Sequence, residues 1–118
     1  MAKDDMRIIM YKILRYLYEC NRKGVAPCFA DMCHHCKLFH IPQEYWAQIM
    51  LEMIEKGFVR GFSVRKTKDG VLIQPHDRPQ ITFDGVEFLE ENRAMQKAKA
   101  HLGEAFEIVL DSIISAIL

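Results

Sequence analysis

The sequence has no excess of charge of either sign. Sixteen Lys and Arg residues balance sixteen Asp and Glu residues, so the net charge is zero with neutral histidines. Avid, non-specific binding of nucleic acid depends on cations that neutralise many phosphates, and a balanced total argues against that class. The charges are nevertheless distributed unevenly. Residues 1–23 carry six basic and three acidic side chains, residues 60–78 carry five and two, and residues 84–118 carry three and seven.

Long apolar runs are also missing. No stretch of 18 apolar residues occurs, so we expect no transmembrane helix. The first residues, MAKDDMRIIMYK, contain no extended uncharged core, so we expect no signal peptide. The apolar tail that begins at Ala105 is interrupted by Glu107 and Asp111. These absences predict a soluble, cytoplasmic protein whose four cysteines are reduced thiols.

Recognisable catalytic patterns are absent as well. No paired carboxylates stand in a known frame, no glycine-rich phosphate loop occurs, and no nucleophile lies within a motif. Cys36 and His40 have the residue types of a catalytic dyad, but any segment rich in Cys and His permits that pairing. We therefore predict no enzymatic activity and no cofactor.

Four residues invite a metal interpretation: Cys28, Cys33, Cys36 and His40. A Cys-x2-Cys pair with a histidine nearby is one half of a zinc-binding pattern, but no second pair of ligands completes it. Cys33 and Cys36 also fall at helical spacing among apolar neighbours, where a free cysteine behaves as a small hydrophobic side chain. We favour structural cysteines over a metal or redox site and predict no metal.

The most informative stretch of this one-domain chain is residues 42–57, PQEYWAQIMLEMIEKG. Pro42 suits the first turn of a helix, and Gly57 suits the position after the last turn. The predicted buried stripe of this helix contains Trp46, Ile49, Met50, Met53 and Ile54. Its predicted outward face contains Gln43, Glu44, Ala47, Gln48, Leu51 and Glu55.

A charged hairpin is predicted directly after that helix, in FVRGFSVRKTKDGVLIQP. Asp69-Gly70 is a dipeptide typical of tight hairpin turns, and Phe58 and Val59 begin the first strand. The return strand is expected over Val71–Gln74, because Pro75 and Pro79 limit further pairing. A helix followed by a basic hairpin is typical of winged helix-turn-helix proteins.

Other helices are predicted on both sides of this unit. Apolar spacing predicts a first helix over Met6–Cys20, which ends before Gly24, and a second over Phe29–Cys36. Thr82 is a plausible N-cap for a further helix. From about Met95 the chain is predicted to stay helical to its end, with a seam typical of coiled coils. We predict a mainly α winged-helix domain over residues 1–94 and a C-terminal dimerisation helix over residues 95–118.

Two stretches, EYWAQIMLEMIEKGFVRGFSV and RPQITFDGVEFLEENRAMQKAKAHL, resemble the YjcQ family of small bacterial and phage-associated proteins. The resemblance covers most of residues 5–105. It implies a winged-helix fold, a regulatory or DNA-binding role and a C-terminal helix used for assembly. It supplies no established activity. The Cys- and His-rich segment and the apolar last dozen residues depart from the family pattern.

The hairpin and the outward face of the helix before it carry the candidate contacts with double-stranded DNA. A basic hairpin can grip a phosphate backbone, whereas exposed strands also carry cations that block edge-to-edge aggregation. The acidic, leucine-bearing helix face suits a protein partner equally well. A DNA-binding transcriptional regulator and a protein-interaction adaptor are therefore both consistent with the pattern. The candidate DNA contacts are Gln43, Glu44, Gln48, Arg60, Arg65, Lys66, Lys68 and Arg78.

The C-terminal apolar ridge is the candidate dimer interface. Its width predicts that part of it needs a partner, because large exposed apolar patches mark interfaces. The alternative is that the last helix folds back over the first helix as part of the core. The ridge contains Leu102, Phe106, Val109, Leu110, Ile113, Ile114, Ile117 and Leu118.

Overall fold

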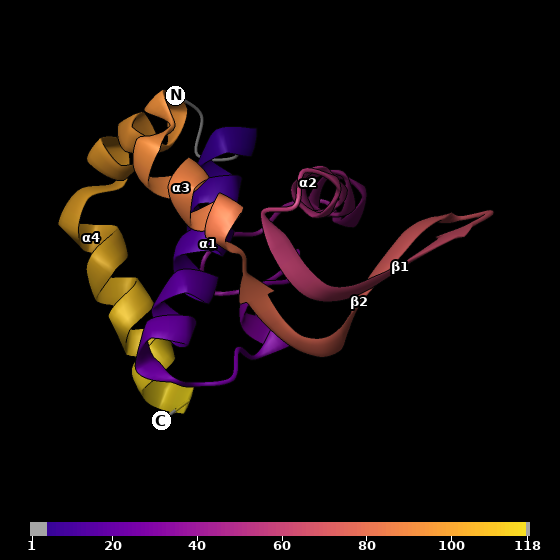
Figure 1. The fold of residues 1–118 in the computed structure, drawn as a ribbon, viewed down its shortest axis with the longest axis horizontal. Helices are drawn as coiled ribbons and strands as arrows, with labels where there is room; N and C mark the ends of the chain where they lie inside the picture. Colours follow the sequence, from indigo (N-terminus) through magenta and orange to yellow (C-terminus); the bar gives the residue numbers. More distant parts are fainter. Residues whose placement is uncertain (1–4, 118) are drawn as a thin grey trace.

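The helix α1 lies at the centre of the computed structural model, which describes residues 5–117 (Figure 1). One side of α1 is covered by α4, and α2 and the β-hairpin lie on the other side (Figure 1). The ridge residue Leu118 and the outermost residues of the two predicted domains lie outside the described residues. In chain order the elements are α1 (Met6–Lys23), the single 3₁₀ turn η1 (Phe29–Asp31), α2 (Gln43–Glu55), β1 (Val59–Thr67), β2 (Gly70–Ile81), α3 (Phe83–Glu91) and α4 (Arg93–Ile117).

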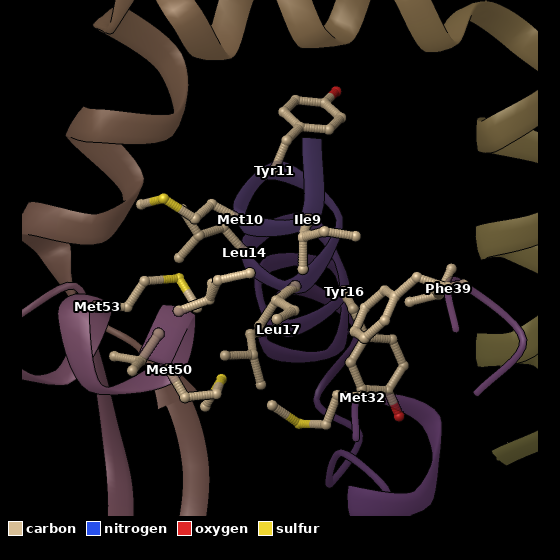
Figure 2. Close-up of a cluster of buried hydrophobic side chains, with 14 of the residues drawn as sticks. Ile9, Met10, Tyr11, Leu14, Tyr16, Leu17, Met32, Phe39, Met50 and Met53 are labelled. Carbon is tan, nitrogen blue, oxygen red and sulfur yellow. The ribbon is translucent and has the colours of Figure 1, made fainter. Parts of the chain in front are cut away.

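The predicted first helix is confirmed and is buried on nearly all sides. The Asp5 carboxylate accepts a hydrogen bond from a backbone N–H of the first turn, and Gly24 ends the helix with a left-handed φ of 68°. Met50 and Met53 of α2 project toward α1 (Figure 2). Apolar residues on several sides of α1 are covered by the other elements, which explains its central place. The buried residues of α1 are Ile8, Ile9, Met10, Tyr11, Ile13, Leu14, Tyr16, Leu17 and Cys20.

The predicted helix over residues 42–57 is confirmed as α2, which begins after Pro42 and ends at Glu55. Four of the five predicted core residues are buried, and the fifth, Ile54, is half-buried. Ala47 was expected on the outward face and is instead buried. Its side chain belongs to the core cluster and also borders a groove between α2 and the hairpin, which Val71 lines as well.

The predicted helix over Phe29–Cys36 is wrong, because only the turn η1 forms there. Tertiary hydrogen bonds take the backbone groups that a helix would use. The Met32 carbonyl accepts from the Trp46 indole N–H at 2.8 Å, and the Cys36 N–H, which would be its partner in a helix, donates to the Phe39 carbonyl at 3.0 Å. The chain then makes a small loop in which a bridge pairs His35 with His40. The helical spacing of apolar residues at this position therefore does not indicate a helix.

The hairpin is longer than predicted, because β2 continues through Pro75 and Pro79 to Ile81. Both strands of a two-stranded sheet are edges, so a proline there removes no essential ladder bond. The register is broken by a bulge, in which four residues of β2 lie opposite Gly61. Gly61 has a φ of 91°, and a Cβ there would lie 2.5 Å from the Arg78 carbonyl oxygen. The bulge therefore requires glycine.

A clamp of backbone and hydroxyl contacts joins the two ends of the hairpin. The predicted N-cap Thr82 is confirmed, since its hydroxyl accepts from the Gly85 N–H at 3.0 Å. The same hydroxyl donates to the Gly57 carbonyl, and the Thr82 N–H donates to the Phe58 carbonyl at 2.9 Å. The Phe58 ring stacks on Phe88 with 4.3 Å between centroids. The start of β1 and the end of β2 are thus held by the first turns of α3.

The predicted unbroken C-terminal helix is wrong at Gly103, which has φ 62° and ψ −155° within α4. Residues 104–117 turn back and pack along α1. The ring centroids of Phe106 and Tyr11 lie 5.7 Å apart there. Four residues of the predicted ridge are buried within the chain: Phe106, Leu110, Ile113 and Ile114. Within one chain, residues 104–117 therefore fold back over α1 as part of the core, and the dimer interface stays a prediction. Core side chains come from both sides of the predicted boundary at residue 95.

No helix among residues 5–117 combines the length and the apolar character that a membrane crossing requires.

Candidate nucleic-acid interface

Contacts of the buried face of α2 fix the direction in which its outward face points. Trp46 packs edge-on against Phe29 and donates its indole N–H to the Met32 carbonyl. This anchoring leaves Gln43, Glu44 and Gln48 exposed to solvent on one face of α2. Two amides and one carboxylate of this kind can hydrogen-bond to base edges, although the carboxylate repels phosphates.

The hairpin displays five exposed cations in two groups. Arg60 and Arg78 lie near its base, and Arg60 donates to the Gln80 side-chain oxygen at 3.2 and 3.0 Å. Arg65, Lys66 and Lys68 lie near its tip. Within residues 5–117, none of the five has an acidic side chain within ion-pair distance.

The tip cations Arg65 and Lys66 occupy opposite faces of the hairpin. Directly opposed residues of an antiparallel pair share a face, and successive residues alternate between faces. Lys66 is paired with Val71, whose face also includes the buried Ile73, and this is the face turned toward α2. Arg65 is paired with Leu72 on the outer face. A ligand that contacts only one face would therefore meet only one of these two cations.

A groove of about 400 Å³ separates the outward face of α2 from the hairpin tip. All three predicted base-contacting residues of α2 line this groove, so the structure brings them close to the tip of the hairpin. Two carboxylates, those of Glu44 and Asp69, also border it. Sequence reasoning identified Asp69-Gly70 as a turn but missed that the turn lies against α2. The lining residues are Gln43, Glu44, Ala47, Gln48, Leu51, Asp69, Gly70 and Val71.

Two cations of α1, Arg15 and Lys12, are engaged within the helical body. Arg15 forms a two-pronged ion pair with Glu107 at 2.7 and 2.8 Å. Burial lowers the pKa of Arg15, but the hydrogen bonds that its guanidinium donates to Glu107 and Tyr11 outweigh burial and leave that pKa raised. Lys12 donates to the Leu38 carbonyl at 2.8 Å. These side chains hold the helical body together.

The Cys- and His-rich segment presents no metal centre in the described part of the chain, where no three suitable side chains converge. Cys28 is exposed, and Cys33 and Cys36 are half-buried. Burial raises the pKa of the Cys36 thiol, which makes it a weaker nucleophile at neutral pH. Nδ1 of His35 and Nε2 of His40 lie 3.1 Å apart, so the ring of His40 contacts His35 across the loop.

The order of helix, turn, second long helix, hairpin and capped helix defines a winged-helix protein, with the hairpin as its wing. Its second helix is shortened to the single turn η1. The chain belongs to the YjcQ family, since the family model described as YjcQ protein matches residues 11–107. The resemblance seen in the sequence is thereby confirmed. No curated protein and no solved structure matches the chain.

Proposed function

We propose that this chain is a DNA-binding transcriptional regulator of winged-helix type that acts as a cytoplasmic, non-catalytic homodimer. One observation carries the proposal. The five hairpin cations are exposed, and among residues 5–117 none is paired with an acidic side chain. Unpaired cations on a projecting hairpin release counterions when they meet phosphates, and this release favours binding.

The proposed contact divides the work between the wing and α2. The tip cations Arg65, Lys66 and Lys68 contact the phosphate backbone or a minor groove. Gln43 and Gln48 line the protein groove between α2 and the hairpin tip. In the proposed complex, the duplex that contacts the wing also contacts this face of α2. Glu44 accepts a hydrogen bond from a cytosine amine, which offsets its repulsion from phosphate.

A gel shift against pooled genomic fragments at low and moderate salt tests this function. We expect micromolar protein to shift DNA at low salt and to release it as salt rises. Replacing Arg65 and Lys66 together with Ala removes one phosphate contact if the duplex meets one face of the hairpin and two if the hairpin enters a groove, so the salt slope should fall by about 1 to 2.

The matched control replaces Lys97 and Lys99, two exposed cations of α4, with Ala. This variant has the same net charge as the hairpin variant, and we expect its DNA affinity to equal that of the wild type. Absence of any salt-sensitive shift, or equal losses in both variants, contradicts the proposed contact.

A second candidate function is a protein-interaction adaptor, which the groove between α2 and the hairpin supports. Leu51 and Val71 supply half-buried apolar surface there, and Glu44 and Asp69 supply negative charge. This combination suits a peptide that carries both an apolar and a basic side chain.

One double variant separates the two functions. Glu44→Gln with Asp69→Asn removes two negative charges and preserves the turn chemistry, because Asn-Gly also favours tight hairpin turns. DNA binding should strengthen in this variant because the phosphates are repelled less. Binding of a basic peptide should weaken. A stronger gel shift supports the regulator, and weaker capture of a Lys- and Leu-containing peptide library supports the adaptor.

A further inference from the structure

The break in α4 consists of a single residue. Gly103 has φ 62° and ψ −155°, a backbone region that only glycine occupies readily. Helical residues precede and follow it directly. No atom lies within 4 Å of the position that a Cβ would take, so the space around the break is open. The bent form of α4 therefore depends on one unhindered glycine.

The spacing of apolar residues on both sides of Gly103 is the same as in one continuous helix. Buried or half-buried residues follow one another at steps of three and four through the break, as one face of a helix does. Were Gly103 helical, these residues would form a single stripe along about 28 Å of straight helix. The stripe consists of Met95, Ala98, Leu102, Phe106, Leu110 and Ile113.

Residues 104–117 are held in place chiefly by α1. Arg15 of α1 pairs with Glu107, and Lys23 of α1 pairs with Asp111 at 3.2 Å. Phe106 packs on the ring of Tyr11, also in α1. No contact in this set depends on which chain supplies the segment. An α1 from a second copy offers the same cations and the same apolar surface.

We propose that residues 104–117 exchange between two copies of the chain, with Gly103 as the hinge. In the exchanged dimer α4 is straight, and each terminal segment packs on the α1 of the partner. Such swapping is a low-cost route to a two-fold dimer because it reuses contacts already present within one chain. This inference deepens the homodimer of the proposed function and rests on that part of it alone. It also explains how a ridge that is buried within one chain can serve as an interface between two.

Charge reversal across the Arg15–Glu107 pair provides the decisive test. Arg15→Glu alone brings carboxylates together in every copy, and Glu107→Arg alone brings guanidinium groups together. Mixing the two variants restores an attractive pair at both positions only if the segments exchange between chains. The variants are unfolded, mixed in equal amounts with one of them isotope-labelled, refolded together and analysed by native mass spectrometry.

We expect the mixed dimer to exceed each single-variant dimer about tenfold, which corresponds to about 1.4 kcal/mol. Monomers alone in the mixture overturn the proposal. A statistical distribution, with mixed dimers at about half of all dimers, also overturns it, because such dimers form through another face. The measurement contains no nucleic acid, so its outcome is independent of whether the protein binds DNA.

A hinge variant gives a second test that leaves the ion pairs intact. Gly103→Ala disfavours the bent backbone and favours the straight helix of the exchanged dimer. We therefore expect its sedimentation mass to remain that of two chains at dilutions at which the wild-type dimer has dissociated to single chains. Gly24→Ala is the matched control, since Gly24 also has a positive φ and open space around it but ends α1. We expect that variant to keep the wild-type mass. A folded Gly103→Ala protein with the wild-type mass contradicts the hinge.

Discussion

The helical body and the hairpin use positive charge in opposite ways. In the body, Arg15, Arg22 and Lys23 each lie within 3.3 Å of a carboxylate oxygen. In the hairpin, five cations lie exposed with no such partner among residues 5–117. A balanced total charge therefore conceals two regions: a body in which three cations of α1 are paired with carboxylates, and a hairpin whose five cations are exposed. Net charge alone therefore does not show how the cations of this chain are distributed.

The largest expected effect comes from breaking the body where α4 meets α1. Phe106→Ala removes a buried ring from its contact with Tyr11, and we expect the free energy of unfolding to fall by about 3–5 kcal/mol. Urea denaturation followed by far-UV circular dichroism measures this loss. The matched control is Ile108→Ala, which truncates a side chain that is 69% exposed on the same helix. Equal losses in the two variants contradict the packing of α4 on α1.

A smaller effect is expected from alkaline pH, again in the body. Burial raises the pKa of the Cys20 thiol to about 11. The unfolded chain ionises this thiol from about pH 8.5, whereas the folded chain keeps it neutral. Stability is therefore fully present below pH 8.5 and falls as pH rises toward 11, by up to about 1.4 kcal/mol per pH unit for one group.

Urea midpoints at pH 7.5 and pH 10 measure this loss in the wild type and in Cys20→Ala. The variant lacks the thiol, so its midpoint should fall less between the two pH values. Burial also raises the pKa of Tyr11 and of Tyr16. The wild type and Cys20→Ala both contain these tyrosines, so both proteins lose the same additional stability at still higher pH. An identical pH dependence in both proteins shows that Cys20 is not shielded from water.

The smallest expected effect on stability comes from the hairpin cations. Arg65→Ala and Lys66→Ala change exposed side chains without ion-pair partners in the described chain, so each should alter the free energy of unfolding by less than about 0.5 kcal/mol. Their effects on DNA affinity should differ, because the two side chains lie on opposite faces. The larger loss identifies the face that meets the duplex. A loss of stability above about 1 kcal/mol in either variant assigns that cation a structural role.

The parts of the fold that were predictable depend on local signals. Gly24 and Gly57 take positive φ angles at helix ends, Pro42 precedes the first turn of α2, and Thr82 caps α3. Each of these residues acts on its immediate neighbours. Their roles are therefore visible in the sequence without knowledge of what packs against them.

The errors arose where distant residues decide the local structure. The Met32 carbonyl accepts a hydrogen bond from Trp46, in a segment where the apolar spacing favoured a helix and only a turn forms. Pro75 is tolerated because its strand has only one neighbour. Arg15 and Arg65 look alike in the sequence, yet only Arg15 meets a carboxylate, which comes from Glu107. The candidate site was recognised by composition, but the groove beside it depends on where the hairpin tip lies.

The clamp around Thr82 has a consequence for how the hairpin can vary in length. Its hydroxyl and amide tie Gly57 and Phe58 to the start of α3, so the root of the hairpin is complete without any contribution from the tip. The turn at Lys68–Gly70 is exposed, and exposed tips accept inserted residues readily. Pairs of residues added or removed there preserve the alternation of faces. The length of the hairpin can therefore change without altering the contacts that join its root to α3.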